Sequence, residues 1–337
     1  MARSRFLPDN FTLYLVATVI AASLLPATGR VAQVLEVATT VAVSLLFFLH
    51  GAKLSRQAIF AGIGHWRLHL MVVASTFVLF PLLGWALRPL LEPLVTRDLY
   101  TGILYLCALP ATVQSAIAFV SMARGNIPAA VCSASASTLL GVAFTPLVVG
   151  LLLSQNAAMG DPLDAMGRIG LQLLVPFVAG HLLRPWLAGF LQRRASVMKV
   201  VDQGSILLVV YVAFSHAVID GLWSQVPPGA LAGLLLVCAV LLALVLTITT
   251  WSARRMGFSK EDEITIVFCG SKKSLISGVP MANVLFSASV AGAIVLPLML
   301  FHQMQLMVCA VLAQRYARRA VAAERPEAVA VVAGRQA

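Results

Sequence analysis

Charge is scarce in this sequence. Only 11% of its 337 residues are charged, and the 13 acidic residues are outnumbered by 24 basic ones. With 60% hydrophobic residues and a mean hydropathy of +0.93, the composition excludes an ordinary soluble domain. A net charge of +11 would suggest nucleic acid in a soluble protein. Here the positions of the basic residues explain it better, so we expect no nucleic-acid partner.

Several signatures of chemistry are also absent. The sequence contains no HExxH or GxSxG motif and no paired-carboxylate signature, so we expect neither an enzyme nor catalytic residues. The five cysteines lie within apolar runs without paired spacing. They predict no disulfide, metal cluster or cofactor, and they are typical of small helix-packing residues.

Long apolar runs recur along most of the chain and indicate helices that cross a hydrocarbon core of about 30 Å. They are continuous rather than alternating, so they predict an all-α polytopic protein whose surroundings are a lipid bilayer. No cleavable signal peptide is expected, because other apolar runs follow the first one at once. We predict ten transmembrane helices, over 10–28, 33–51, 67–87, 98–122, 127–154, 164–183, 203–222, 229–252, 262–286 and 289–314.

Ten spans divide into two sets of five. Because five is odd, a repeat of five spans has inverted topology, which is a common plan for transporters. We therefore predict one five-helix repeat over residues 1–154, a second, inverted repeat over 155–319, and a mobile cytoplasmic tail over 320–337.

The fourth span of each set is interrupted by residues that weaken a helix. Span four reads CALPATVQSAIAFVSMARGN and span nine reads CGSKKSLISGVP, with Pro110 in the first and Gly278 and Pro280 in the second. Interrupted segments at matching positions of two halves point to a substrate site near the membrane midplane. Proline and glycine are also frequent in membrane helices generally, which is the alternative explanation.

Span nine also carries two adjacent lysines, Lys272 and Lys273. Lys272 lies 12 residues after Lys260, about 18 Å along a helix from the expected membrane surface. A cation at the bilayer centre costs roughly 2.5–3.5 kcal/mol, so the lysines must face a wet cavity or find partners. Glu36 is the only acid expected inside a span, and this excess of positive charge favours an anion. Alternatively, backbone carbonyls of the broken helices hold one ammonium.

Four sequence stretches resemble the bile acid:sodium symporter family, and specifically its SBF-like branch, which includes the animal solute carrier 10 family member 7. They are FCGSKKSLISGVPMANVLF, MARGN, CSASASTLLGVAFTPL and FFLHGAKLS, and the resemblance covers nearly the whole chain. It implies a panel domain and a core domain, with spans four and nine unwound and crossing in the core. In sodium-coupled members of the family, Na⁺ sites flank that crossing.

The resemblance places the span-four ligand pair on Gln114 and Ser115 and the span-three glutamine on Thr76. It places the family's acidic ligand on Phe268 and a glutamine on Lys272. An ammonium therefore stands where a sodium ligand is expected, and one lysine could replace the cation while the other meets the substrate, or the reverse.

The candidates for a substrate or ion site come from spans three, four, five, nine and ten. The hydroxyls of span five could instead serve only helix packing, and His302 of span ten could form a helix–helix hydrogen bond rather than carry a proton. The full set is Lys272, Lys273, Ser271, Ser274, Gln114, Ser115, Thr112, Ser133, Ser135, Asn283, Gln303 and Thr76.

These features favour a secondary transporter of a small organic anion that works by alternating access. A sodium- or proton-coupled symporter is the first alternative, so Na⁺ stays open as a coupling ion, and a membrane regulator of ion homeostasis without transport is the second. The sequence does not fix the oligomeric state.

We predict that both termini lie in the cytoplasm, in an inner (plasma) membrane. Alternate loops and the termini hold 18 lysines and arginines on one side and 4 on the other, besides Lys272 and Lys273. Cysteine labelling from each side of the membrane measures this orientation. A C-terminus labelled from outside would contradict both the ten-span topology and the inverted repeat.

Overall fold

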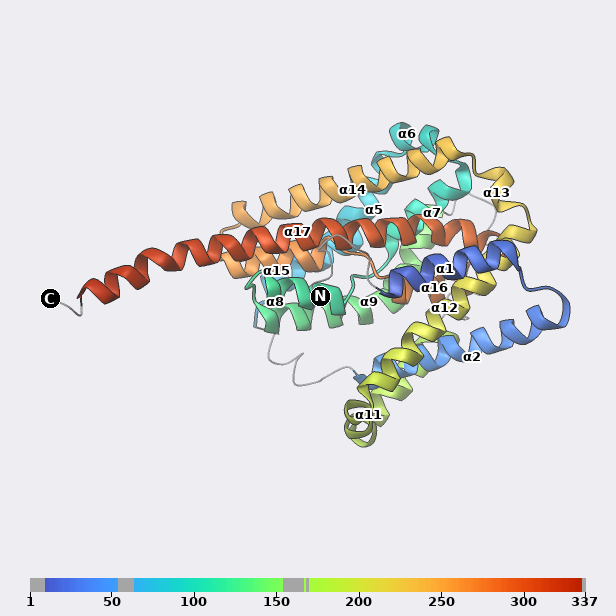
Figure 1. Ribbon diagram of the computed structural model, residues 1–337, viewed down its shortest axis with the longest axis horizontal. Helices are drawn as coiled ribbons and strands as arrows, with labels where there is room; N and C mark the ends of the chain where they lie inside the picture. The colour runs from blue at the N-terminus through green and yellow to red at the C-terminus, as the bar shows by residue number, and fades with distance from the viewer. Residues whose placement is uncertain (1–9, 54–63, 154–166, 168–169, 335–337) are drawn as a thin grey trace.

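In the computed structural model, which describes residues 10–53, 64–153, 167 and 170–334, every regular element is helical (Figure 1). The elements are α1 (Asn10–Leu24), α2 (Gly29–Lys53), α4 (Trp66–Ala74), the π-helix η1 (Ser75–Leu79), α5 (Phe80–Ala86), α6 (Arg88–Leu91), the 3₁₀-helix η2 (Glu92–Leu94), α7 (Arg97–Ala108), α8 (Gln114–Met122), α9 (Ile127–Leu153), the π-helix η3 (Gly170–Leu174), α11 (Val175–Arg193), α12 (Ala195–Ile219), α13 (Leu222–Gln225), α14 (Pro228–Arg255), α15 (Lys260–Gly270), α16 (Leu275–Leu285) and α17 (Ala288–Gly334).

Each of the ten predicted spans is mainly helical in its described part. Six helical segments are long and apolar enough to cross a membrane by themselves: Gly29–Lys53, Trp66–Ala86, Ile127–Leu153, Ala195–Ile219, Pro228–Arg255 and Ser289–Arg319. The predicted all-α, multi-pass membrane class is therefore confirmed. Spans four and nine are each divided into two short helices, and α1 has only 15 residues. The total of ten crossings stays a prediction.

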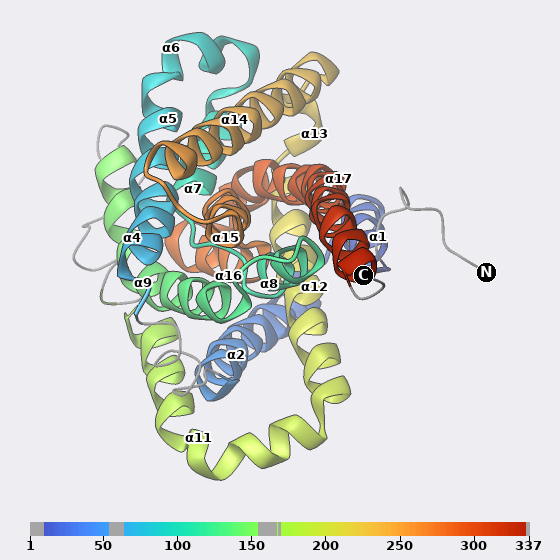
Figure 2. The same ribbon diagram turned by 90° about the vertical axis from the view of Figure 1, so that its left-hand side faces the viewer.

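Four helices, α1, α2, α11 and α12, pack mainly against one another, and we call them the peripheral group (Figure 2). Helices α2 and α11 approach at backbone distance. A methyl group on Gly51 would overlap the carbonyl of Phe177, and one on Gly180 would overlap the carbonyl of Phe48. Small residues at both contact points allow this close crossing, as in many membrane helix pairs.

Most of the other helices form the central group, which comprises α4, η1, α5, α7, α8, α9 and α14 to α17. Figure 2 shows α8, α15 and α16 near its middle, with α14 and α17 on one side and α2 and α12 on the other. Helix α12 contacts both α16 and α17, so it forms a border between the two groups. One large hydrophobic core cluster includes buried aromatic residues of both groups, among them Tyr105, Phe214 and Phe301.

Helix α17 is the longest element and runs to Gly334, beyond the other helices (Figure 1). Residues 320–334 of the predicted tail are therefore helical. Their mobility, and the division into repeats at 154 and 155, stay predictions.

Candidate functional site

The two predicted interruptions are real breaks, and they touch each other. Helix α7 ends at Ala108 and α8 begins at Gln114, while α15 ends at Gly270 and α16 begins at Leu275. The backbone N–H of Ser274, in the second break, donates to the carbonyl of Pro110 in the first at 2.9 Å. Four helix ends thus meet inside the central group, and we call this region the crossing.

Local sequence explains both breaks. Leu109 precedes a proline and is extended, with φ −73° and ψ 155°, because proline disfavours a helical residue before it. On the other side Ser274 caps α16, since its hydroxyl accepts the N–H of Ser277 at 3.2 Å. Pro280 lies inside α16, six residues beyond the cap, so it does not form the break to which the sequence analysis linked it.

Lys273 lies at the centre of the crossing and is fully buried. Its ammonium donates to three backbone carbonyls, those of Thr76 at 2.8 Å, Cys107 at 2.8 Å and Leu109 at 2.7 Å. The Nζ atom also lies 4.1 Å from the centre of the Phe80 ring. An ammonium has three N–H donors, and all three are satisfied here.

The carbonyl of Thr76 is available because of a π-helical turn followed by a proline. In η1 the N–H of Phe80 bonds to the carbonyl of Ser75, one residue further back than in an α-helix. The next residue, Pro81, has no N–H to give to Thr76. The widened turn therefore leaves one acceptor free in the buried interior, and Lys273 occupies it.

The last carbonyls of α7 also lack helical N–H partners. The N–H of Ala111, which could reach Cys107 in a continuing helix, instead bonds to the hydroxyl of Ser137 at 2.9 Å. The hydroxyl of Thr145 donates to Ala108 at 2.9 Å. The carbonyls of Cys107 and Leu109, on either side of Ala108, are therefore left for the Lys273 ammonium, which donates to both. They lie at the negative end of the α7 dipole.

The backbone of Lys273 is fixed by Gln305 of α17. The side-chain oxygen of Gln305 accepts the N–H of Lys273 at 2.9 Å, and its side-chain nitrogen donates to the Lys273 carbonyl at 2.9 Å. His302 bonds to the same amide nitrogen at 2.9 Å. Gln305 is fully buried, so this amide pins the unwound segment against α17.

Lys272 is equally buried but is held differently. Its ammonium donates to the carbonyl of Ser115 at 3.0 Å and lies over two aromatic rings, Phe119 at 3.9 Å and Phe268 at 5.2 Å. Within the described residues it has no second hydrogen-bond acceptor, and neither lysine forms an ion pair with a carboxylate. The two lysines are therefore not equivalent: Lys273 has a complete carbonyl cage, and Lys272 has one carbonyl and two ring faces.

Some other predicted site residues also lie at the crossing. Ser271 is in the second break, and Thr112 and Ser115 share a hydroxyl hydrogen bond of 2.7 Å beside the first. Thr76 contributes its carbonyl rather than its hydroxyl, which bonds to Val72 at 2.8 Å.

The remaining candidates lie outside these contacts. Ser133 bonds to His69 at 2.7 Å and ties α9 to α4. Ser135, Asn283 and Gln303 are half-buried and do not hydrogen-bond to either lysine. Gln114 is exposed and lines a separate cavity.

Residues that sequence reasoning did not select act mainly through backbone or ring atoms. They are Cys107, Leu109, Phe80, Phe119 and Gln305. A signal existed for some of them, because Pro110 ends α7 and leaves its last carbonyls without helical partners, and Pro81 has no N–H to donate. Choosing Gln305 over Gln303 would have required the rotation of α17, which the sequence does not give.

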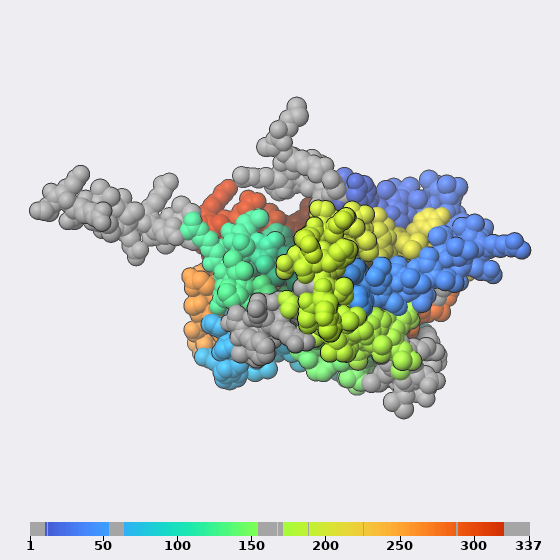
Figure 3. All heavy atoms as spheres, turned by 90° about the horizontal axis from the view of Figure 1, so that it is seen from below, coloured from blue at the N-terminus to red at the C-terminus, as the bar shows by residue number. Residues whose placement is uncertain are grey.

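The cavity beside Gln114 has a volume of about 380 Å³ and lies between the two helix groups. Lys53 of α2, Arg184 and Gln192 of α11, and Lys199 of α12 line it from the peripheral group, together with Asp202, which pairs with Lys53. Figure 3 shows α11 in yellow-green, between the teal region of α8 and the blue helices α1 and α2. Within the described residues, the buried Nε of Arg184 has no hydrogen-bond partner.

Comparison with known proteins gives matches over almost the full chain. Residues 9–318 match the SBF-like CPA transporter family. Uncharacterized protein PA2026 of Pseudomonas aeruginosa is 68% identical, over 95% of this chain and 96% of its own length. The protein named Putative symporter YfeH of Escherichia coli is 58% identical, over 92% of this chain and 93% of its own.

A more distant animal relative also matches over most of both chains. Sodium/bile acid cotransporter 7 of Rattus norvegicus is 26% identical, over 90% of both chains. The resemblance inferred from the motifs is therefore confirmed, and so is the expectation that the protein is not an enzyme. Joined breaks inside an all-helical membrane protein and a match over residues 9–318 lead to one conclusion: this chain belongs to the SBF-like CPA transporter family.

Proposed function

We propose that this protein is a secondary transporter of an organic anion, working by alternating access, in which the ammonium of Lys273 replaces a bound cation. One observation carries the proposal: Lys273 donates to three backbone carbonyls contributed by two separate helix breaks or turns. Carbonyls of unwound helices are the ligands with which many transporters hold Na⁺. Here a tethered cation of the same charge fills them.

The charge balance of the crossing supports an anionic substrate. Two ammonium groups lie there without a carboxylate partner among the described residues. The N-termini of α8 and α16 point to the same region and add partial positive charge. A cationic substrate would be repelled, whereas a carboxylate, sulfonate or phosphate would be attracted.

The cavity beside Gln114 is the place where we expect the anion to bind. Three cationic side chains and one carboxylate line it, so its net charge is positive. The unpaired Nε of Arg184 is a buried donor, and leaving such a donor without an acceptor costs free energy that an anion would recover. Gln114 supplies the opposite wall from the first residue of α8, so the anion would bridge the two helix groups.

This location would couple binding to movement. In the proposal the peripheral group acts as a panel domain and the central group as a core domain, and the two repeats span residues 1–154 and 155–319. Both breaks lie in the fourth span of their five, which supports that division. The protein would then lie in the inner (plasma) membrane with both termini in the cytoplasm.

Coupling to sodium is the main alternative, and the name of the rat relative favours it. Against it, the position to which the resemblance assigns an acidic ligand is Phe268, whose ring lies 5.2 Å from the Lys272 ammonium. A second cation beside two ammonium groups would be repelled without a carboxylate to compensate. We therefore propose transport without Na⁺, driven by the anion gradient or by protons.

Lys273→Met should destabilise the protein more than Lys272→Met. The first change leaves three buried carbonyls without their donor, and the second leaves one, at roughly 1–3 kcal/mol for each group. We expect a clearly lower melting temperature for Lys273→Met, and reduced anion uptake with a smaller loss of stability for Lys272→Met. If both variants melt and transport like the parent, neither lysine belongs to the site.

Sodium should not stabilise the parent protein. A ligand that binds only the folded state at a hundred times its Kd adds about 2.7 kcal/mol, which a melting experiment detects. We expect equal melting temperatures in millimolar NaCl, KCl and choline chloride. Lys273→Ala provides the matched comparison, because it empties the carbonyl cage, and Na⁺ or methylammonium should then raise the melting temperature. A selective rise with NaCl in the parent would refute the replacement of sodium by lysine.

Uptake by purified protein in liposomes tests the function itself. With a panel of labelled organic anions and imposed sodium or pH gradients, we expect uptake of at least one anion without any requirement for Na⁺. Arg184→Gln should raise the KM for that anion roughly 10- to 100-fold, which corresponds to one lost charge-assisted hydrogen bond.

Arg193→Gln is the control for that experiment, because Arg193 lies on the same helix, is exposed and does not line the cavity. It should leave KM unchanged. Uptake that requires Na⁺ would favour the sodium-coupled alternative, and a KM unaffected by Arg184→Gln would place the anion elsewhere.

A further inference from the structure

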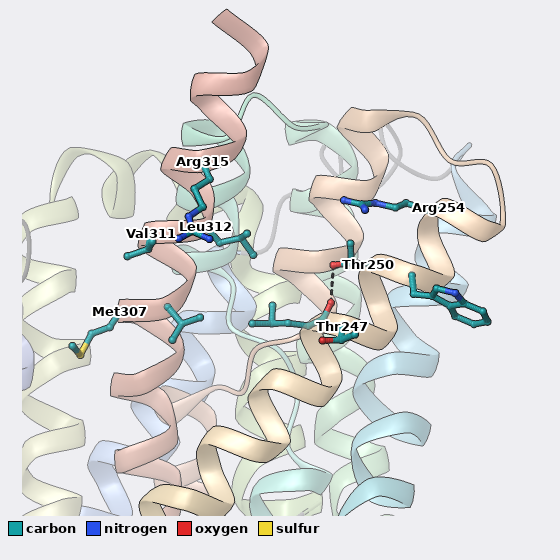
Figure 4. A pocket seen from close by; sticks show the side chains of 10 residues that line it. Thr247, Thr250, Arg254, Met307, Val311, Leu312 and Arg315 are labelled. Atoms are coloured by element: carbon teal, nitrogen blue, oxygen red, sulfur yellow. Dashed lines mark hydrogen bonds between the residues drawn. The ribbon is translucent and has the colours of Figure 1, made fainter. Parts of the chain in front are cut away.

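A second hollow lies on the outer side of the central group, between α14 and α17 (Figure 4). It has a volume of about 690 Å³ and lies apart from the crossing. Its walls are mostly apolar, with Leu246 and Trp251 on α14 and Met307, Val308 and Val311 on α17. Arg254 and Arg315 line one end. We call this hollow the α14–α17 groove.

The apolar part of the groove faces outward. Trp251 is 64% exposed and Met307 is 51% exposed, so these side chains are not covered by the rest of the chain. In a membrane-spanning helix pair this face is in contact with lipid tails. The lining runs from Leu246 to Arg254 and from Met307 to Arg315, nine residues on each helix, and the rise between its ends is about 12 Å. That length is close to one leaflet, half of a hydrocarbon core of about 30 Å.

The two arginines mark the end of the groove near the membrane surface. Trp251 lies three residues from Arg254, and exposed tryptophan is enriched at the level of lipid headgroups. In Figure 4 the side chain of Arg254 extends from α14 toward α17, and Arg315 projects from α17 beside the groove. The groove therefore has apolar walls along most of its length and two guanidinium groups at one end.

One acid, Glu263, lies beside Arg254. Arg254 donates to Glu263 from Nε at 3.2 Å and from Nη2 at 3.1 Å, and Lys260 donates to both carboxylate oxygens at 2.8 Å. Tyr316 also donates to Glu263, at 2.9 Å. Glu263 is buried and fully partnered, and with Arg254, Lys260 and Arg315 it leaves the cluster positive. A guanidinium has five N–H donors, so Arg254 retains donors beyond the two used here.

We propose that the α14–α17 groove binds one anionic phospholipid, with an acyl chain along the apolar walls and the headgroup phosphate on Arg315 and Arg254. Basic residues at the surface end of a cleft between membrane helices are a recognised arrangement for anionic headgroups. A second copy of the chain is a poorer occupant, because it would have to bury two like-charged arginines.

Such a lipid would affect the crossing indirectly, because the two helices that it bridges both connect to the crossing. Helix α17 carries Gln305, which holds the backbone of Lys273, and α14 packs along α15, which ends at the second break. A phospholipid that joins α14 to α17 would brace α15 between them. This site is separate from the proposed anion cavity and does not depend on the proposed substrate.

Native mass spectrometry of the full-length protein in a mixture of phosphatidylglycerol and phosphatidylethanolamine tests the proposal. We expect preferential retention of phosphatidylglycerol by the parent. Arg315→Gln should lower that retention about fivefold, the contribution of one basic residue near an anionic surface. Val311→Trp should fill the groove and lower the retention of both lipids.

Arg318→Gln is the matched control. Arg318 is exposed, lies on the same helix about one turn further on and does not line the groove, so its loss changes the net charge equally. Equal retention of both lipids by the parent, or equal losses with Arg315→Gln and Arg318→Gln, would overturn the proposal. Disulfide-linked dimers formed in membranes through Val311→Cys would show that a second copy covers the groove. Should a variant not fold, stronger thermal stabilisation of the parent by phosphatidylglycerol than by phosphatidylethanolamine is still required.

Discussion

A buried ammonium needs acceptors, and that constraint organises the centre of this protein. Lys273 is fully buried and has no carboxylate partner among the described residues, so its charge is balanced by oxygen atoms of the backbone. Within a regular helix each carbonyl is bonded to the N–H four residues later, and only the last turn has carbonyls without such a partner. The fold must therefore break its own helices around the lysine. The breaks leave carbonyls that are costly without a donor, and the ammonium is costly without them.

Two departures from regular helix geometry supply these three oxygens, and a proline lies at each of them. The π-turn at η1 shifts the bond of Phe80 back to Ser75, and Pro81 then gives Thr76 no partner. Pro110 stops α7 and frees the carbonyls at its end. Hydroxyls and amides from neighbouring helices take the remaining groups, such as Ser137 for the N–H of Ala111. The crossing is thus one hydrogen-bond network to which α4–α5, α7, α9, α15 and α17 all contribute.

Much of the helix arrangement could be predicted from the sequence. The length of an apolar run, and the distance of a charged residue from the membrane surface, follow from the order of residues alone. The helical character of the predicted ranges, the two breaks and the deep position of the two lysines followed from apolar runs, proline and glycine, and the distance from Lys260 to Lys272. The contacts could not be predicted in the same way. That Lys273 rather than Lys272 would fill the carbonyl cage depends on the direction of each side chain in an unwound segment. The choice of Gln305, the cavity at Arg184 and the groove at Arg315 depend on helix rotation and packing, which pattern alone leaves undetermined.

The replacement that we propose changes what the crossing can respond to. The stabilisation that a bound ion gives to a carbonyl cage depends on the ion's concentration, and each binding event has an entropic cost. A lysine that is part of the chain is always present, so the cage around Lys273 would hold its shape whatever the ion gradients are. A transporter built in this way gains a constant structure but loses the ion as a source of energy at that position. Any coupling would then have to act where the charges are less completely satisfied, at Lys272 with its one carbonyl or at Arg184 with its unpaired donor.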